Sequence, residues 1–247
     1  MPNLKDQVVL ITGANRGQGK DIAKHFASLG AKVAVGARNL EDAEALSVEI
    51  GQHQSLPVQL DVTKEAEWTT AVQSIMQTYH KIDVLVNNAG IFTKKPLLDT
   101  TVEDFQQLIQ VNQLGVFMGL QAVAPYMEKQ QKGSIVNNIS ISAFAPINES
   151  AAYAATKAAV SNLSKSAAME LGPKGIRVNA IHPGVIETNM VSSSNLNVNE
   201  AEAIPLKRLG QSKDIAQVAA FLASDESAYC NGAEIVVDGG LTLGTDV

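Results

Sequence analysis

A tyrosine and a lysine four residues apart are the side chains of this sequence best suited to move a proton. Tyr153 and Lys157 fall in a stretch with a helical pattern, so both project from one face of the expected helix. A tyrosine titrates near pH ~10, and a neighbouring ammonium favours its phenolate, which brings it closer to acid or base chemistry at neutral pH. Ser140 precedes Tyr153 by thirteen residues, at the predicted end of a strand, where its hydroxyl could bind a substrate oxygen. An exposed amphipathic helix face would show the same tyrosine–lysine spacing.

A glycine-rich segment, Thr12–Gly19, follows the first apolar run of the chain and precedes a helical pattern. Glycine suits this turn because a side chain would hold a diphosphate away from the helix N-terminus, whose free N–H groups and dipole favour an anion. Turns also collect glycine for structural reasons. The strand, helix and strand around the segment favour a dinucleotide-binding loop.

The order of elements predicts an α/β fold, a Rossmann-like doubly wound parallel sheet with helices on both faces. Seven strands are expected, at Val8 to Thr12, Lys32 to Gly36, Pro57 to Asp61, Val84 to Asn87, Ser134 to Ser140, Arg177 to His182 and Glu234 to Val237. Helices are expected at Gly17 to Leu29, Leu40 to Ile50, Glu65 to Tyr79, Val102 to Lys129, Ala151 to Leu171 and Lys213 to Ala223. No linker or repeat interrupts this alternation, so residues 1–247 are expected to form a single domain.

Composition and charge exclude several classes of function. The 247 residues are 45% apolar and 18% charged, as in ordinary globular proteins, and a net charge of -6 leaves no basic excess for nucleic acid. The single cysteine, Cys230, excludes an intramolecular disulfide and a Cys-rich zinc site. The four histidines show no metal spacing, and His182 is assigned no catalytic role. The first residues do not resemble a signal peptide and no apolar run reaches the ~18 residues of a membrane helix, so a cytoplasmic protein without metal is expected.

Further motifs make nearly the whole chain resemble the short-chain dehydrogenase/reductase family. Three residues separate the first two glycines of the loop, and the later motifs are Asn87-Asn88-Ala89-Gly90, Asn112, Ser140, Tyr153 with Lys157, and Pro183-Gly184. Each motif is weak alone, but their order and their places after the expected strands are typical of this family. The segment Asn137-Asn138-Ile139-Ser140 departs from the common Asn-Ile-Ser-Ser pattern, with Ile where the first serine often stands. The serine expected in catalysis is kept.

The resemblance implies catalytic roles for four residues. Tyr153 would donate a proton to the carbonyl oxygen in reduction, or remove it from the alcohol in oxidation, and Ser140 would orient that oxygen. Lys157 would lower the pKa of the tyrosine and hold the nicotinamide ribose. Asn112 would complete a proton relay through water to Lys157; a polar residue that kinks the long helix is the alternative.

The resemblance also implies which residues line the cofactor. Asp61 and Val62 would flank the adenine, and Ile186 and Thr188 would meet the carboxamide. The full set is Gly13, Asn15, Arg16, Gly17, Gln18, Gly19, Arg38, Asp61, Val62, Asn88, Ala89, Gly90, Tyr153, Lys157, Pro183, Gly184, Ile186 and Thr188. Asp61 could equally cap the helix that follows it.

The end of the second predicted strand bears on the choice of cofactor. The two nicotinamide dinucleotides differ by a 2′-phosphate, which an acidic side chain would repel. Ala37 occupies the expected ribose-binding position, and Arg38 follows with a guanidinium suited to phosphate. Arg16 is a second candidate, so NADP(H) is favoured. NAD(H) stays an alternative, because Arg38 can stack over the adenine and Glu41 or Asp42 could supply a carboxylate.

We therefore expect an oxidoreductase that transfers a hydride between NADP(H) and a ketone/secondary alcohol pair. The polar stretch at residues 188–205 is expected to form a substrate loop. Candidate lining residues are apolar, namely Phe144, Ile147, Val185 and Met190, which favours a hydrophobic, cyclic, steroid-like or aryl ketone over a sugar. Core packing would explain the same residues.

Several alternatives stay open. The chain is similar by eye to 3-oxoacyl carrier-protein reductases and to bacterial hydroxysteroid dehydrogenases, some of which use NAD(H). Sugar epimerases or dehydratases of this fold are usually longer, and a dinucleotide-sensing scaffold would have lost the tyrosine. Family members commonly form tetramers through the regions that correspond to 106–129, 151–171 and 236–240, so a homotetramer is expected; packing on the sheet would also require apolar helix faces.

Overall fold

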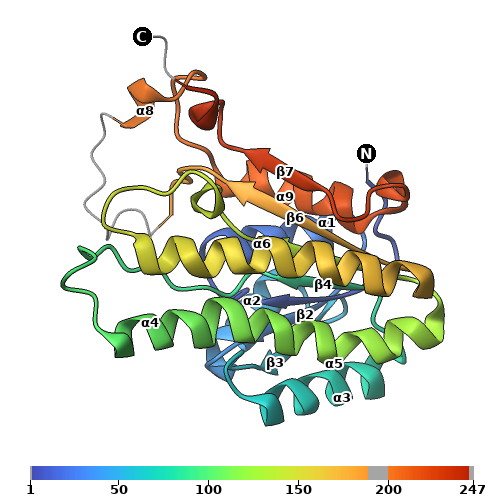
Figure 1. The fold of residues 1–247 in the computed structure, drawn as a ribbon. Coiled ribbons are helices and arrows are strands. Elements are labelled where there is room, and N and C mark those ends of the chain that lie inside the picture. The colour runs from blue at the N-terminus through green and yellow to red at the C-terminus, as the bar shows by residue number, and fades with distance from the viewer. Residues whose placement is uncertain (1, 189–199, 245–247) are drawn as a thin grey trace.

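Seven parallel strands form one sheet in the order β3-β2-β1-β4-β5-β6-β7 (Figure 1). Their bounds are β1 (Val8–Thr12), β2 (Lys32–Ala37), β3 (Ser55–Gln59), β4 (Val84–Asn87), β5 (Gly133–Asn138), β6 (Ile176–Pro183) and β7 (Glu234–Val237). The structure is a computed structural model and describes residues 2–188 and 200–244. The predicted α/β fold with a doubly wound parallel sheet is confirmed.

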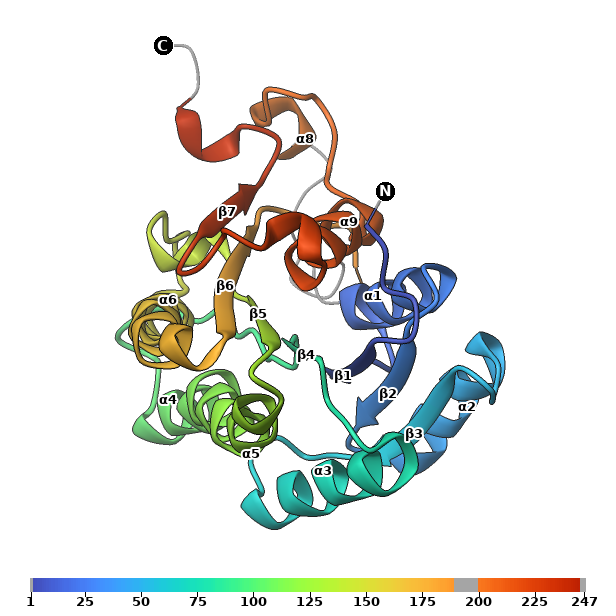
Figure 2. The same cartoon turned by 90° about the vertical axis from the view of Figure 1, so that its right-hand side faces the viewer.

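Helices cover both faces of the sheet, as Figures 1 and 2 show. They are α1 (Gly17–Ser28), α2 (Leu40–Ile50), α3 (Glu65–Tyr79), α4 (Val102–Leu108), α5 (Gly115–Gln130), α6 (Ala151–Leu171), α8 (Glu200–Ala203) and α9 (Ser212–Ala223). Buried side chains of α1, α2 and α9 share one hydrophobic cluster, and those of α3, α5 and α6 share the other. The two clusters lie on opposite faces of the sheet.

The first strand shows why the sequence carries unbroken apolar runs. All five residues of β1 are buried. Val9 and Ile11 belong to the cluster that contains Phe26 of α1, whereas Val8 and Leu10 belong to the cluster around Trp68 of α3. Successive side chains of a strand point to opposite faces, so a strand covered on both sides needs apolar residues at every position.

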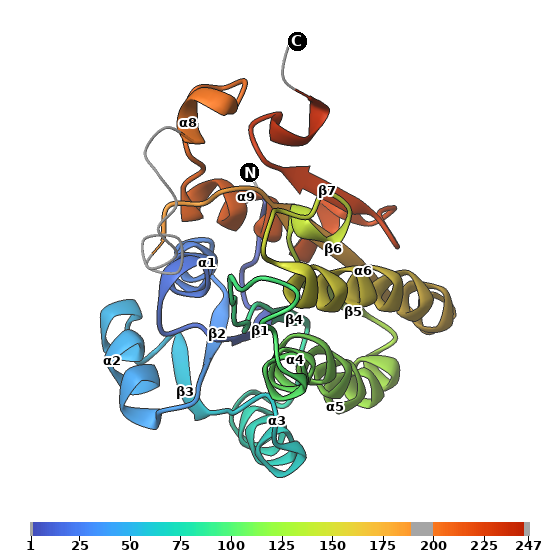
Figure 3. The same cartoon turned by 60° about the vertical axis from the view of Figure 1, so that its left-hand side comes forward.

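The chain reverses its direction across the sheet between β1 and β4, which lie side by side. In open α/β sheets, ligands bind outside the carboxyl ends of the strands at such a switch point. The segments that follow β1, β4, β5 and β6 all emerge at this edge, which Figure 3 views from another side. These segments carry most of the residues that the sequence analysis selected.

Several predicted bounds are wrong. The expected helix Val102 to Lys129 is interrupted by a π-helical turn at Ile109–Leu114, which separates α4 from α5. The expected strand Ser134 to Ser140 ends at Asn138, so Ser140 lies in the turn after β5. Strand β3 starts at Ser55 and includes Pro57, which is tolerated because β3 pairs only with β2 at the sheet edge.

The predicted substrate loop at 188–205 is only partly visible. Residues 189–199, including Met190, lie outside the described residues, and the short helix α8 follows them. Among the described residues, no helix is long and apolar enough to cross a membrane. In the same part of the chain, no group of His, Cys, Asp or Glu side chains is arranged to hold a metal ion.

Candidate active site

The loop after β1 takes a shape that requires glycine. Gly13 has φ +62° and Gly17 has φ +52°, in the left-handed region that other residues rarely adopt. At Gly19, a Cβ atom would lie 2.3 Å from the Gly13 carbonyl oxygen and 2.5 Å from Nδ2 of Asn88. The first turn of α1 therefore packs against the loop at a distance that only glycine allows.

The loop after β4 holds the glycine loop in place. The backbone N–H groups of Asn88 and Ala89 both donate to Thr12 Oγ1 at 3.0 Å. The Asn88 amide donates to the carbonyl oxygens of Thr12 and Gly13, at 3.0 and 3.2 Å. Asn88, predicted to line the cofactor, thus also fixes the shape of the loop that would hold it.

The start of α1 fits a diphosphate. Its N-cap residue, Arg16, is exposed and makes no side-chain capping bond, and the first turn contains no acidic residue. The first backbone N–H groups of a helix lack partners within the helix and carry a partial positive charge, which an anion satisfies. The glycine loop and this helix start are therefore suited to a nicotinamide dinucleotide.

Ser140 and Tyr153 meet at the carboxyl edge of the sheet. A hydrogen bond joins their side chains, although Ser140 comes from the turn after β5 and Tyr153 from the first turn of α6. The backbone N–H of Ser142 donates to Ser140 Oγ at 3.1 Å, and the Phe92 ring meets the tyrosine ring edge-on at 4.9 Å. Both hydroxyls are thus oriented by neighbours.

Lys157 lies one helical turn after Tyr153 and is 6% exposed. Its Nζ is 5.5 Å from the centre of the tyrosine ring. Burial lowers the pKa of Lys157 to about 8. Burial also raises the pKa of Tyr153 to about 12, against the opposite effect of the Ser140 hydrogen bond. The expected lowering of the tyrosine pKa is therefore not found, because desolvation outweighs the lowering effect of the Ser140 hydrogen bond.

Asn112 lies in the π-helical turn between α4 and α5 and is 1% exposed. Its amide donates to the Ile91 carbonyl at 2.9 Å and its oxygen accepts from the Ile91 N–H at 2.8 Å. A Cβ on Gly90 would lie 3.3 Å from Asn112 Oδ1 and 3.6 Å from Lys157 Nζ. Asn112 thus interrupts the long helix, which was one of the two alternatives for this residue. It also lies beside Lys157, as a proton relay to that lysine would require.

Asp61 does not cap the following helix, which was the alternative for this residue, because the N-cap residue of α3 is Lys64. The Asp61 carboxylate accepts hydrogen bonds from the backbone N–H and the hydroxyl of Thr63, at 3.0 and 2.8 Å, and so closes the turn before α3. Burial would raise the pKa of Asp61, but these bonds and the charges of Lys64 and Arg38 lower it. Val62 is buried, and its carbonyl accepts from the indole of Trp68.

The segment after β6 approaches the glycine loop. Gly184 follows the strand and packs so tightly that a Cβ there would lie 2.7 Å from Asp238 Cα. Ile186 is buried and forms a bridge with Gly210. A Cβ at Gly17 would be 3.8 Å from the Thr188 methyl. Thr188, predicted to meet the carboxamide, thus lies against the glycine loop predicted to hold the diphosphate.

Two side chains at the carboxyl edge of the sheet, Asn138 and His182, were not predicted to belong to the site. The Asn138 amide donates to Gln18 Oε1 at 2.8 Å and to Asn88 Oδ1 at 3.0 Å, which links β5 to both cofactor loops. The sequence does mark Asn138, because this amide stands where the common Asn-Ile-Ser-Ser pattern has an apolar residue. His182, assigned no role, is fully buried and contacts the Ser140 carbonyl.

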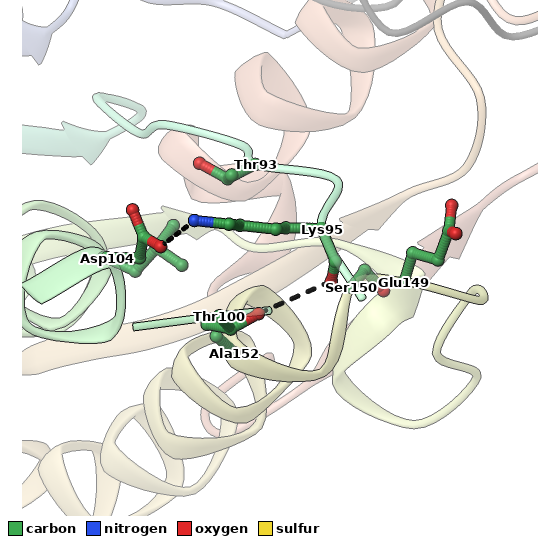
Figure 4. Close-up of a pocket in the computed structure, with 8 residues that line it drawn as sticks. Thr93, Lys95, Thr100, Asp104, Glu149, Ser150 and Ala152 are labelled. Carbon is green, nitrogen blue, oxygen red and sulfur yellow. Dashed lines mark hydrogen bonds and ion pairs between the residues drawn. The ribbon is translucent and has the colours of Figure 1, made fainter. Parts of the chain in front are cut away.

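A small cavity next to the first turn of α6 is lined by an ion pair (Figure 4). Lys95 extends to Asp104 of α4, with Nζ 2.5 Å from the carboxylate oxygen. The Lys95 N–H donates to the Glu149 carbonyl at 2.6 Å. A groove of about 520 Å³ adjoins it, lined by Pro96, Leu97, Pro146, Ile147, Asn148, Glu149, Ala151 and Ala154. The ion pair thus ties the loop after β4 to α4, and the backbone hydrogen bond ties it to the segment before α6. The loop and this segment together border an apolar groove.

Known proteins share this arrangement along the whole chain. A family model described as "Enoyl-(Acyl carrier protein) reductase" matches residues 13–242. The chain belongs to the short-chain dehydrogenase/reductase family. It is therefore an NAD(P)-dependent oxidoreductase of the CH–OH class. It is 40% identical to a trans-4-hydroxycyclohexanecarboxylate dehydrogenase of Sinomonas cyclohexanicum, over 98% of this chain and 95% of the relative. It is 39% identical to a 3-alpha-(or 20-beta)-hydroxysteroid dehydrogenase of Mycobacterium tuberculosis (strain ATCC 25618 / H37Rv), over 96% and 90%.

Solved structures of the family agree in fold. A 3-ketoacyl-(acyl-carrier-protein) reductase from Brucella melitensis, complexed with NADH, matches with a TM-score of 0.94 and 36% identity, over 97% of this chain and 100% of that one. A gluconate 5-dehydrogenase from Burkholderia cenocepacia, in complex with NADP and tartrate, matches with a TM-score of 0.94 and 33% identity, over 98% of both chains. Both cofactors thus occur among its structural neighbours.

Proposed function

We propose that this dehydrogenase/reductase transfers a hydride between NADP(H) and a ketone/secondary alcohol pair, as a carbonyl reductase of a fairly hydrophobic ketone. The observation that carries the proposal is the hydrogen bond between Ser140 and Tyr153, with Lys157 one helical turn away. These groups stand at the carboxyl edge of the sheet, beside the glycine loop that suits a dinucleotide.

Each side chain would have a separate role at the substrate oxygen. Ser140 and Tyr153 would both donate hydrogen bonds to it, and Tyr153 would pass its proton to the oxygen in reduction or accept one in oxidation. The nicotinamide of a bound cofactor supplies or accepts the hydride. Lys157, with a pKa of about 8, is mostly an ammonium at neutral pH and would stabilise the phenolate. Asn112, next to Gly90, would relay protons through water to Lys157.

NADP(H) is the cofactor we propose, because two arginines are expected beside the 2′ position. Arg38 and Arg16 are exposed, and among the described contacts neither makes an ion pair. The Asp42 carboxylate, which could have bound a ribose, accepts a hydrogen bond from the Asn15 amide at 3.1 Å. Both guanidinium groups are thus available for phosphate. NAD(H) is the alternative that assays must separate.

A cyclic or otherwise hydrophobic ketone is the substrate class we propose. Phe144 and Ile147 are 53% and 39% exposed and stand on the segment between Ser140 and Tyr153. Phe92 packs on the tyrosine ring from the other side. The relatives named for a cyclohexane carboxylate and for hydroxysteroids support this class. The Brucella structure supports a second candidate, 3-oxoacyl carrier-protein reduction.

We also propose a homotetramer of single-domain chains in the cytoplasm, with residues 188–205 as the substrate loop. Large apolar side chains remain exposed on the elements predicted to form the interfaces, including Phe117 of α5, Met169 of α6 and Val236 of β7. Burial of these side chains between subunits would remove their apolar surface from water. Light scattering of the eluted protein measures the oligomeric state, and a monomer at micromolar concentration would contradict the proposal.

The first experiment follows absorbance of the reduced cofactor with NADPH and, separately, NADH, on β-keto esters, cyclic diketones, aryl ketones and keto-steroids. We expect oxidation of NADPH with a cyclic or aryl ketone. Tyr153→Phe should abolish turnover and leave NADPH binding, measured by fluorescence, within about twofold, since the cofactor contacts remain. Wild-type turnover in this variant would refute the catalytic assignment.

Arg38→Leu tests the cofactor choice within one protein. We expect the KM for NADPH to rise about tenfold or more, because a charge-assisted contact to the phosphate is lost. The KM for NADH should change by less than about twofold, which makes NADH the internal control. An equal change for both cofactors would show that Arg38 contacts a part that they share.

A further inference from the structure

His182 is a fully buried histidine whose ring nitrogens both face oxygen acceptors. It stands near the end of β6, with Nδ1 2.8 Å from the Ser140 carbonyl oxygen and Nε2 3.2 Å from Glu234 Oε1 at the start of β7. A carbonyl oxygen cannot donate a hydrogen bond, and neither can an ionised carboxylate. The two contacts are both hydrogen bonds only when each ring nitrogen carries a proton.

Glu234 is the charged partner of this pair. Lys165 Nζ lies 2.5 Å from its Oε2, and the Ser161 hydroxyl donates to its Oε1. Partial burial would raise the pKa of Glu234, but the bonds from Lys165 and Ser161 and the nearby positive charges lower it. The carboxylate is thus ionised at neutral pH and faces Nε2 of the buried ring.

The Ser140 carbonyl belongs to the turn that presents the Ser140 hydroxyl. This carbonyl also accepts the Ala143 N–H at 3.2 Å, so two donors fix it. On the far side of the same residue, the hydroxyl bonds Tyr153. A chain of contacts thus runs from Lys165 and Glu234 through His182 to the backbone of the serine.

We propose that His182 is a positioning residue that, as a doubly protonated imidazolium held between Glu234 and the Ser140 carbonyl, fixes the turn that aims the Ser140 hydroxyl at Tyr153. The kinetic part of this inference rests on the proposed function, because it assumes that Ser140 orients the substrate oxygen. The protonation part does not.

The groups that face the ring come from three parts of the chain. Glu234 faces it from β7, and Lys165 of α6 lies on the far side of that carboxylate. Ser140 faces it from the turn after β5, and the Phe144 ring packs against it at 5.3 Å, adding no charge. Among the described contacts, Glu234 is the charged group paired with the imidazole, and it is negative.

Two substitutions separate positioning from packing. His182→Leu removes both donors but keeps an apolar side chain, and we expect kcat to fall about tenfold or more with cofactor binding within about twofold, because small misplacements of a catalytic group are costly. His182→Asn places an amide N–H near the position of Nδ1 and should restore kcat to within about threefold of wild type. A third variant, Glu128→Gln, is the control for the Glu234→Gln variant described next. Glu128 of α5 also pairs with a lysine, Lys174, at 3.0 Å, but away from the site.

Glu234→Gln tests the protonation state. Its amide can donate to Nε2, so the ring should become neutral at pH 7 while Nδ1 still donates to Ser140, and kcat should stay within about threefold. Nitrogen-15 NMR of the wild type should show both ring nitrogens of His182 protonated at pH 7, and one in Glu234→Gln.

Three results would overturn the inference. They are a wild-type ring with one protonated nitrogen, an unchanged kcat in His182→Leu, and an Asn variant as slow as the Leu variant. If His182→Leu does not fold, the NMR result and the His182→Asn kinetics still decide. If no ketone or alcohol is turned over by any variant or by wild type, the proposed function fails, and the NMR result stands on its own.

Discussion

Lys157→Met is expected to stabilise the protein without bound cofactor while abolishing turnover. The lysine is 6% exposed, and burial lowers its pKa from 10.5 to about 8. A difference of that size between the unfolded and folded states lowers stability at pH 7 by up to ~3 kcal/mol. Methionine keeps most of the side-chain volume and has no charge to desolvate.

The stability difference between Lys157→Met and wild type should depend on pH. Below pH 8 the lysine is protonated in both states, and the full cost of burying the charge is present. Between pH 8 and 10.5 only the unfolded state binds the proton, so wild-type stability rises with pH relative to the variant. The advantage of Lys157→Met should therefore shrink from up to ~3 kcal/mol at pH 7 to ~2 kcal/mol at pH 9.

Urea unfolding followed by circular dichroism at pH 7 and 9 measures this advantage. The series stops below pH 10, because burial raises the pKa of Tyr153 from 10.0 to about 12 and stability is lost as pH rises through that window. Lys213→Met, at an exposed position on α9, is the control and should change stability by less than about 0.5 kcal/mol. A variant no more stable than wild type at pH 7, or an advantage that does not shrink at pH 9, would refute the reasoning.

Two further outcomes follow from the geometry of the loops. Gly19→Ala places a Cβ 2.3 Å from the Gly13 carbonyl, so it should lower the Tm and raise the cofactor KM about tenfold; unchanged values would mean that the helix start can move away freely. Asn112→Ala leaves the Ile91 N–H and carbonyl without their partners and should cost about 2 kcal/mol in urea unfolding, whereas Asn39→Ala, exposed and without a capping bond, should cost less than about 0.5. Equal losses in the two variants would contradict the buried role of Asn112.

The bounds of several strands and helices could be predicted from the local pattern of apolar and polar residues. Strands β1, β4 and β7 have the predicted bounds, as do α2, α3 and α6. In β1 every residue is buried, so the apolar run alone marks the strand. A kink at Asn112 was one alternative, but the bounds of the π-helical turn were not predicted, because Asn112 bonds Ile91, which is 21 residues earlier in the chain. No local pattern records that contact.

In the candidate active site, too, the features set by local sequence were predicted and those set by tertiary contacts were not. Spacing placed Tyr153 and Lys157 on one face of α6, and the structure brings Ser140 to the tyrosine. The direction of the tyrosine pKa was wrong because desolvation depends on everything packed around the ring, which spacing does not contain. His182 was dismissed because its partners, Ser140 and Glu234, are 42 and 52 residues away.

Departures from ordinary protein structure gather at one edge of the sheet. They include the positive φ of Gly13 and Gly17, the π-helical turn and the buried ammonium of Lys157. Each costs stability that the two apolar clusters must offset, and such costs persist where function requires the geometry. If Lys157 contributed only to packing, an apolar side chain would serve better there. The most stable variant at this position should therefore be an inactive one, and this links the stability measurement to the catalytic role of the edge.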